Sequence, residues 1–285
     1  MNDRRNFLKT ASALAGAMVA GVAHATKAET APPAPARVVA STPEHDMSAM
    51  PASWMGNDKI AMLLYPGFTA LDLVGPQYFF ASLMGATVQL VAKERTPVMS
   101  DTGLAIMPTA TLDECEPNLD VLFVPGSGVG VLNAMEDPTL VAFVADRGAR
   151  AKWVTSVCTG SLLLARAGLL TGYRATGHWM ARDVLADFGA IPVNERVVRD
   201  RNRMTGAGVS AGLDLGLAMT AELRDRAYAE GVQLLAEYAP EPPFDAGTPE
   251  TAPKAVADLI SGMFPGFVAR AQRIARTMPA TAKGG

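Results

Sequence analysis

The chain has 285 residues, of which 49% are hydrophobic and 19% are charged, and its formal net charge is −3. This composition is typical of one large globular domain or two small ones, and it excludes a chain that is mainly disordered. Two cysteines are too few for a disulfide-stapled mini-protein, and no run of Lys and Arg is present to neutralise nucleic-acid phosphates, so we expect no nucleic-acid partner.

The first 25 residues have the order of a secretory signal. Arg4 and Arg5 precede an apolar, Ala- and Gly-rich run over residues 11–22, which is followed by a small-x-small cleavage pattern that ends at Ala25. The paired arginines, with Phe and Leu close behind, resemble the twin-arginine signal that exports folded proteins from the bacterial cytoplasm. We expect a periplasmic protein that uses the export machinery and keeps no stable membrane association after cleavage; an uncleaved N-terminal helix is the alternative.

The remaining chain divides by composition. Residues 26–57 carry several prolines among Ala, Ser, Thr and Glu without apolar periodicity, which predicts a flexible spacer. Short apolar runs then alternate with amphipathic stretches, which predicts one domain over residues 58–262. Apolar spacing within residues 251–282 predicts a last helix that frays into a tail, so we expect residues 263–285 to be a terminal helix and tail.

The predicted domain alternates strands with helices. Continuous apolar runs predict strands that are buried on both faces, and helical spacing predicts the segments between them. This alternation predicts right-handed crossovers and a mainly parallel sheet covered on both faces, which is a doubly wound α/β sandwich. In chain order, we expect a strand at residues 60–65, a helix at 71–84, strands at 87–92 and 121–124, a helix at 138–149, a strand at 153–157, helices at 160–167 and 178–188, a hairpin at 197–200 and 203–205, and a helix at 212–223.

Cys158 lies in the segment SVCTGS, residues 156–161, between the end of a predicted strand and the start of a predicted helix. A glycine two residues after the thiol lets the backbone turn tightly, which is the pattern of a nucleophile elbow. Because a helix N-terminus stabilises negative charge, we expect a lowered thiol pKa and a nucleophilic role for Cys158; a small buried core residue is the alternative. Cys115 is flanked by acids that raise a thiol pKa, and we expect it to be incidental.

Asp72 lies among apolar residues just after the first predicted strand, in the segment TALDLVGP, residues 69–76. Burial would raise the pKa of its carboxyl group, which suits a group that donates and then recovers a proton. The alternative is an acid that only complements a helix dipole. Because Asp72 and Cys158 both follow strands at the same end of the sheet, we expect the two side chains to meet.

Three further candidates lie in the turns at this end of the sheet. Gly126 and Ser127, in the segment PGSG, offer backbone N–H groups free of bulky side chains, the material of an anion hole. Thr159, next to the thiol, offers an N–H and a hydroxyl that can hold a water or a substrate nitrogen, and its alternative role is helix capping.

His178 is the only histidine in the predicted domain. A site role beside Cys158 and a structural role, such as capping a helix, both remain open. The sequence shows no metal-ligand spacing, dinucleotide fingerprint or phosphate loop, so we expect no metal and no cofactor.

Five spaced motifs resemble the DJ-1/PfpI superfamily, which is similar to class I glutamine amidotransferases. Within it the isonitrile hydratase branch is most similar, because Asp72 stands where DJ-1 and protease-like members usually carry Glu, and Thr159 stands where protease-like members carry His. Ser127 stands where many members have a second glycine. The resemblance runs from about residue 60 to residue 255. The motifs are LDLVGP around Asp72, VTSVCTGS around Cys158, ATGHW at residues 175–179, TGAG at 205–208 and YAPEPPF at 238–244.

The resemblance implies a flavodoxin-like sandwich, a homodimer, no cofactor and hydration of a small isonitrile, R–N≡C, to an N-substituted formamide. Carried onto this chain, it implies that Cys158 attacks the isonitrile carbon while Asp72 protonates it, giving a thioimidate. Water activated by Asp72 and held near Thr159 then releases the formamide.

Two other functions share these motifs. One is the ligand-sensing domain of AraC-type transcription regulators, which also need a DNA-binding domain; here we expect only a short helix and tail after residue 244. The other is a DJ-1-like stress-protective or aldehyde-handling protein in which Cys158 is an oxidation-sensitive thiol. A protease is disfavoured because Thr159 replaces the histidine after the thiol.

Overall fold

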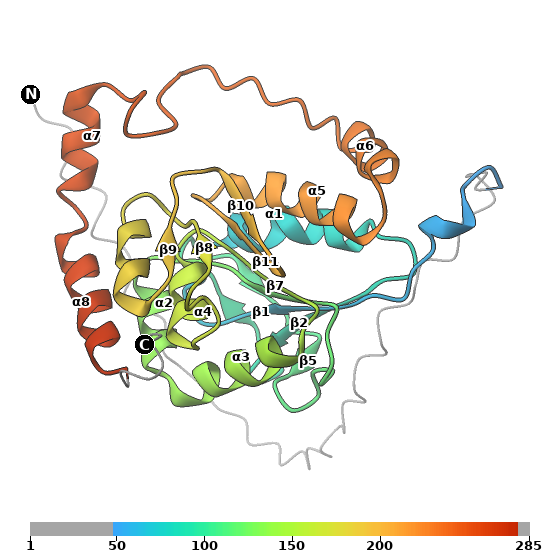
Figure 1. Cartoon of the computed structure of the whole chain (residues 1–285), viewed down its shortest axis with the longest axis horizontal. Helices are drawn as coiled ribbons and strands as arrows, with labels where there is room; N and C mark the ends of the chain where they lie inside the picture. The colour runs from blue at the N-terminus through green and yellow to red at the C-terminus, as the bar shows by residue number, and fades with distance from the viewer. Residues whose placement is uncertain (1–47, 279–285) are drawn as a thin grey trace, which may run out of the picture. The chain divides into compact units, whose positions relative to one another are not determined.

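The computed structural model describes residues 48–278 of the chain. Its main feature is a seven-stranded sheet with the strand order β10-β11-β7-β6-β1-β2-β5 (Figure 1). Every neighbouring pair is parallel except the β10–β11 hairpin, so the expected mainly parallel α/β sandwich is confirmed. The strands of this sheet are β1 (Lys59–Leu63), β2 (Thr87–Ala92), β5 (Ala110–Thr111), β6 (Val121–Val124), β7 (Trp153–Val157), β10 (Val197–Asp200) and β11 (Arg203–Gly206).

The central strands are the four apolar runs that the sequence predicts. Every residue of β6 is buried, as is every residue of β1 after Lys59, because helices cover both faces of the sheet here. The chain adds β2 on one side of β1 and then returns to add β6 on the other side. The strand order therefore reverses at β1 and β6, which leaves a crevice at their carboxyl ends.

Helices form a layer on each face of this sheet (Figure 1). On one face α1 (Ala70–Ala81) packs against α5 (Ala211–Leu223), which also contacts α6 (Arg226–Leu235). Helices α1 and α5 approach closely because glycines face the contact; a Cβ atom on Gly216 would lie 2.9 Å from the Phe79 ring. The other layer consists of α2 (Val129–Glu136), α3 (Pro138–Arg150), α4 (Gly160–Arg166), the 3₁₀ helix η2 (Arg182–Phe188) and α8 (Pro265–Arg276).

The structure departs from the predicted elements where segments are short. The helix predicted at 178–188 is wrong in its first part, because residues 178–181 form a turn and only η2 follows. Helix α6 is missing from the prediction although Asp225 caps it through the Tyr228 N–H, a pattern that the sequence contains. Two-residue strands give no measurable period, so the sequence also misses β3 (Val98–Met99), β4 (Ala105–Ile106), β5, β8 (Arg174–Ala175) and β9 (Ile191–Pro192).

The C-terminal part contains two helices, so the prediction of one helix over residues 251–282 is wrong. Helix α7 (Lys254–Ser261) ends at Gly262, and α8 begins at Pro265, a residue that is favourable in the first turn of a helix. Helix α7 buries no residue, whereas α8 packs against η2 and α2. The residues that α8 buries are Ala271, Ile274 and Ala275.

The expected signal segment, residues 1–25, and most of the expected spacer lie outside the described residues. The last part of the spacer is described, and it packs on the domain through η1 (Ala52–Trp54). The Trp54 indole N–H donates to Asp225 Oδ2 at 2.9 Å, and its ring meets the Tyr228 ring edge-on. Within residues 48–278, no helix combines the length and the apolar character needed to cross a membrane.

Candidate active site

Three turns meet at the carboxyl end of the sheet, where the strand order reverses. They follow β1, β6 and β7, which are neighbours in parallel register. The turns lead into α1, α2 and α4. Gly126 and Cys158 lie in two of the turns, and Asp72 lies just after the third, at the start of α1. Parallel pairing thus brings together residues that are far apart in the sequence.

Cys158 forms a strained turn between β7 and α4. Its φ of 59° lies in the left-handed region, which residues with a Cβ atom seldom occupy. The Cys158 N–H donates to two carbonyl groups at the end of β11, Ala207 O at 2.7 Å and Gly206 O at 3.1 Å. Only glycine fits at position 160, where a Cβ atom would lie 2.3 Å from Val124 O. The backbone geometry is that of a nucleophile elbow.

Asp72 is fully buried in the first turn of α1. The Gly126 N–H donates to its Oδ2 at 2.8 Å, and no described residue makes a hydrogen bond to Oδ1. Burial raises the pKa of Asp72 to about 7, against the lowering effects of the Gly126 N–H and the Cys158 thiol. The sequence-based expectation of a raised pKa agrees with this environment, and the carboxyl group can both give and take a proton near neutral pH.

The Asp72 and Cys158 side chains both lie against Gly126. A Cβ atom on Gly126 would lie 2.8 Å from both Asp72 Oδ2 and Cys158 Cβ, so only glycine fits between them. Burial, and then the Asp72 charge, raise the pKa of Cys158 well above its ordinary value, while the Thr159 N–H and hydroxyl lower it less. The prediction of a lowered thiol pKa is therefore wrong, because burial and the carboxylate outweigh the helix N-terminus. The thiol is protonated at neutral pH and needs a base.

The Gly126–Ser127 turn has its N–H groups occupied within the protein. The Gly126 N–H holds Asp72, and the Ser127 N–H donates to Thr159 Oγ1 at 2.8 Å. The Thr159 hydroxyl donates in turn to Ser127 O at 2.6 Å, and it does not cap α4. Ser127 Oγ accepts from the Val131 N–H at the start of α2. The two N–H groups are therefore not free to serve as the expected anion-hole donors. They hold the side chains of Asp72 and Thr159 in place.

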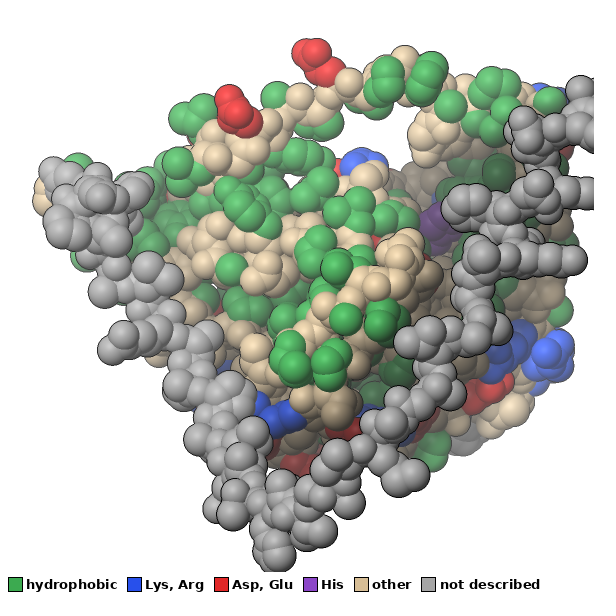
Figure 2. Space-filling model, turned by 180° about the vertical axis from the view of Figure 1, so that it is seen from behind, with side chains coloured by type: hydrophobic (Ala, Val, Ile, Leu, Met, Phe, Trp, Pro, Cys, Tyr) green, Lys and Arg blue, Asp and Glu red, His purple; other side chains and the backbone are tan. Residues whose placement is uncertain are grey.

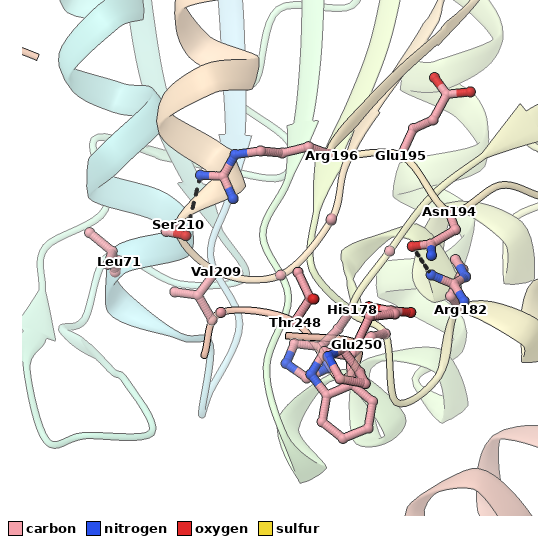
Figure 3. A pocket seen from close by; sticks show the side chains of 16 residues that line it. Leu71, His178, Arg182, Asn194, Glu195, Arg196, Val209, Ser210, Thr248 and Glu250 are labelled. Atoms are coloured by element: carbon pink, nitrogen blue, oxygen red, sulfur yellow. Dashed lines mark hydrogen bonds between the residues drawn. The ribbon is translucent and has the colours of Figure 1, made fainter. Parts of the chain in front are cut away.

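His178 lies in the wall of a neighbouring pocket of about 530 Å³ (Figure 3). Its Nδ1 accepts from the Met180 N–H at 3.4 Å, and burial lowers the pKa of the ring. The structure gives it no hydrogen bond to Cys158 or Asp72 among the described residues. Leu71, which precedes Asp72, and Ala207, which accepts from the Cys158 N–H, line the same pocket.

Two polar residues near the pair, Tyr65 and Asp101, are not predicted from the sequence. Tyr65, at the end of the run that forms β1, is buried and donates its hydroxyl proton to Pro125 O at 2.7 Å, which fixes the turn after β6. Its apolar surroundings gave no reason to single it out, and burial, with the nearby Asp72 charge, raises its pKa. Asp101 arrives from the β3–β4 hairpin, accepts from the Thr69 hydroxyl at 2.5 Å and adds to the rise in the Asp72 pKa. Nothing in the sequence indicates that this hairpin reaches the site.

Within the part of the chain that the structure describes, no group of three or more His, Cys, Asp and Glu side chains is arranged to hold a metal ion.

Comparisons with known proteins agree with the fold. The family model described as the DJ-1/PfpI family matches residues 58–222. The chain is 52% identical over 200 residues to isonitrile hydratase of Pseudomonas putida, and this match covers 70% of this chain and 87% of that protein. A crystal structure of a ThiJ/PfpI family protein from Pseudomonas syringae is similar with a TM-score of 0.79 and 56% identity, over 82% of this chain and 97% of that one.

A transcriptional regulator, GbdR of Pseudomonas aeruginosa, is 33% identical over 168 residues, but the match covers only 44% of that protein and 55% of this chain. The family match, by contrast, spans the sheet, the strained cysteine turn and the buried carboxyl group. This chain belongs to the DJ-1/PfpI family.

Proposed function

We propose that this protein hydrates isonitriles to N-substituted formamides, with Cys158 as the nucleophile and Asp72 as the proton carrier. The observation that carries the proposal is the buried pair itself, in which a carboxyl group with a pKa of about 7 and a protonated thiol flank Gly126. The 52% identity to isonitrile hydratase of Pseudomonas putida supports the same reaction class.

The first step is addition of the thiol to the isonitrile carbon. In the reactive state the pair holds one proton in total, on Cys158, and the Asp72 carboxylate accepts it as sulfur attacks. Asp72 then gives this proton to the isonitrile carbon, which forms one C–S bond and one C–H bond. The product is a thioimidate, R–N=CH–S, attached to Cys158, and Asp72 is again a carboxylate.

The second step is hydration of the thioimidate. Asp72 takes a proton from water while the hydroxide adds to the thioimidate carbon, and it passes that proton to nitrogen. The C–S bond then breaks, and the hydroxyl proton moves to sulfur. The formamide R–NH–CHO leaves, and the thiol is restored. The sum is one isonitrile and one water to one formamide, with no oxidant, reductant or metal in the balance.

Gly126 and Thr159 position these groups. The Gly126 N–H keeps Oδ2 of Asp72 fixed and leaves Oδ1 free for proton exchange. The Thr159 hydroxyl is held by Ser127, next to the thiol, where it can orient the attacking water. Both residues act by fixing geometry, which reduces the entropy lost on reaching the transition state.

The test is direct detection of N-substituted formamide from a panel of alkyl and aryl isonitriles. Hydration by the native protein, and its loss in Cys158→Ala and Asp72→Asn, would support the mechanism. If no isonitrile gives a formamide while peroxide converts Cys158 to a sulfinic acid, the hydratase proposal is wrong and the stress-protective function takes its place.

We further propose a homodimer. Leu71, Val74 and Tyr78 form an exposed apolar stripe at helical spacing on α1, and they are 44%, 39% and 42% exposed. Figure 2 shows that apolar side chains also gather in a broad group on the face seen from behind. We expect a second copy of this chain to pack against this stripe and bury it. Light scattering during size-exclusion chromatography should give twice the chain mass, and Val74→Asp should lower it, unlike Leu234→Asp at the exposed end of α6.

We also propose that the protein acts in the periplasm. The support is the order of residues 1–25 in the sequence, with Arg4 and Arg5 before an apolar run. Fractionation of cells and N-terminal sequencing of the recovered protein test it: Thr26 as the first residue is the expected result, and uncleaved cytoplasmic protein would contradict it.

A further inference from the structure

The pocket of about 530 Å³ beside the catalytic pair has a size that suits an organic ligand much larger than an isonitrile group alone. Figure 3 shows Leu71 and Val209 on one side of it, with Arg182, Asn194 and Glu195 on the other. The pocket therefore has an apolar wall next to Asp72 and a polar wall farther along the chain.

Small residues separate this pocket from the thiol. Gly177, Ala207 and Gly208 line the pocket, and neither Cys158 nor Asp72 does. A Cβ atom on Gly177 would lie 2.9 Å from Cys158 O, and Ala207 O accepts from the Cys158 N–H. The wall of the pocket thus lies against the backbone of Cys158, and the narrow, linear end of an isonitrile is the part of the substrate that would have to reach the thiol.

Two charged groups of the pocket form ion pairs with residues outside it. Arg196 pairs with Asp214, and Glu195 pairs with Arg174 at 2.9 Å.

The other two charges belong to the far wall. Arg182 donates to the Asn194 side chain, as Figure 3 shows. The pKa of Glu250 lies below its usual range. Hydrogen bonds from the Glu250 backbone N–H and from Thr248 lower it most, and Asn194 and the Arg182 charge lower it further. Arg182 and Arg196 balance Glu195 and Glu250, so the lining carries no net charge that would favour a charged ligand over an uncharged one.

The His178 ring contributes a donor to the wall of the pocket. Its Nδ1 accepts from the Met180 N–H, and partial burial lowers the pKa of the ring and favours its neutral form, whose proton then lies on Nε2. No described residue accepts from Nε2. The ring contacts Trp179, with centroids 5.5 Å apart, and Phe264, at 6.5 Å, and these two rings also contact each other. A Cβ atom on Gly208 would lie 3.3 Å from His178 Cδ2.

We propose that this pocket receives the R group of the substrate, and that His178 Nε2–H donates a hydrogen bond to an uncharged oxygen on it. The protein then prefers neutral isonitriles with a carbonyl or ether oxygen over alkyl isonitriles of the same size. This specificity rests on the hydratase function proposed above. His178 is a specificity-determining residue here and takes no part in proton transfer with Cys158.

The test compares methyl isocyanoacetate with n-pentyl isocyanide, which is of similar size and has no acceptor. The ratio of their kcat/KM values is measured for the native protein, His178→Phe and His178→Gln, so that the intrinsic reactivities cancel between proteins. One hydrogen bond corresponds to about a tenfold change. We expect His178→Phe to lower the ratio about tenfold, mainly through KM of the ester, and His178→Gln to retain most of it. Tyr173→Phe, which removes a hydroxyl outside the pocket, should leave the ratio unchanged.

If the ratio of the two kcat/KM values is unchanged in His178→Phe, whether or not both values fall, the proposal is overturned while the hydratase function stands. Failure of the native protein to hydrate either isonitrile would overturn both. Should His178→Phe not fold, binding of the two formamide products to Cys158→Ser decides the matter by calorimetry. About tenfold tighter binding of the ester-bearing formamide supports the proposal, and equal binding contradicts it.

Discussion

The two cysteines of the domain share burial but differ in what lies next to the thiol. Cys158 is 4% exposed and Cys115 is 3% exposed, and both are free. Burial raises the pKa of both thiols; at Cys158 the Asp72 charge adds to the rise, whereas at Cys115 the Arg147 side chain opposes it. Only Cys158 has the left-handed φ of an elbow. A neighbouring buried carboxyl group that can accept the proton, and not the thiol pKa alone, therefore distinguishes the proposed nucleophile Cys158 from the core residue Cys115.

The pKa of Cys115 is raised for a different reason from the one that the sequence suggests. The sequence predicts a raised pKa from the flanking acids, and the direction is confirmed. The largest cause is burial, however, and Glu116 contributes least. Cys115 packs in the core after β5, and Arg147 from α3 donates to its carbonyl group at 3.2 Å. Acids next to it in sequence matter less than the apolar contacts around its sulfur.

The largest expected effect comes from removing each thiol in turn. Cys158→Ala should lower kcat/KM for isonitrile hydration by at least about 10³-fold, because the covalent intermediate cannot form. Cys115→Ala should keep activity within about twofold and lower the free energy of unfolding by about 1 kcal/mol. Formamide assays and urea unfolding measure both changes. Comparable activity losses in the two variants would contradict the distinction drawn between the cysteines.

Asp72→Asn should have opposite effects on activity and stability. We expect kcat/KM to fall about 10²- to 10⁴-fold, because the proton carrier is lost. The pKa of Asp72 is raised from its ordinary value of 3.8 to about 7 in the folded state, so the folded state holds this proton more tightly than the unfolded state. Stability from this group is therefore present at low pH and is lost as pH rises from about 4 to 7.

At pH 8 the asparagine removes that cost, and Asp72→Asn should be more stable than the native protein by on the order of 1–4 kcal/mol. Asp120→Asn is the matched control: although Asp120 is partly buried, hydrogen bonds from Lys152 and from the Lys59 N–H lower its pKa, so its replacement should destabilise the fold at pH 8. Urea unfolding at two pH values measures both. An Asp72→Asn protein less stable than the native one at pH 8 would rule out the buried-carboxylate argument.

The pH dependence of hydration reports the pair directly. Below the Asp72 pKa of about 7 both Asp72 and Cys158 are protonated, and no base is left to take the thiol proton. We expect kcat/KM to rise with pH through about 7 and then to level off. Initial rates between about pH 5.5 and 8.5 measure this profile. A flat or falling profile would show that the pair does not work with a single proton.

The smallest expected effect is a change in alkylation. Because the Asp72 charge helps to raise the pKa of Cys158, Asp72→Asn should increase its thiolate fraction and speed its reaction with iodoacetamide by several-fold. Cys115, which Asp72 does not influence, should react at the native rate. Mass spectrometry of the two cysteine peptides over time measures both rates. A parallel increase at both sites would indicate general loosening of the fold.

The central sheet is predictable because its strands have strong local patterns. Continuous apolar runs predict β1, β2, β6 and β7, and alternation with helices predicts their parallel order. The two-residue strands and the break between α7 and α8 are not predictable in this way, because they depend on contacts with distant segments. Helix α6 is a different case, because its Asp225 cap is a local signal that the sequence contains.

The sequence by itself determined the positions of the candidate residues. A thiol before Thr-Gly at the end of a strand, and an acid among apolar residues after another strand, identify Cys158 and Asp72, and parallel topology requires them to approach. Tertiary structure alone decided how these groups behave. It raised the pKa of the Cys158 thiol, gave the N–H groups of Gly126 and Ser127 partners inside the protein, and placed His178 in a pocket wall rather than beside the thiol. The physical reason is that burial and charge act through space, among side chains from turns, hairpins and helices that the sequence keeps far apart.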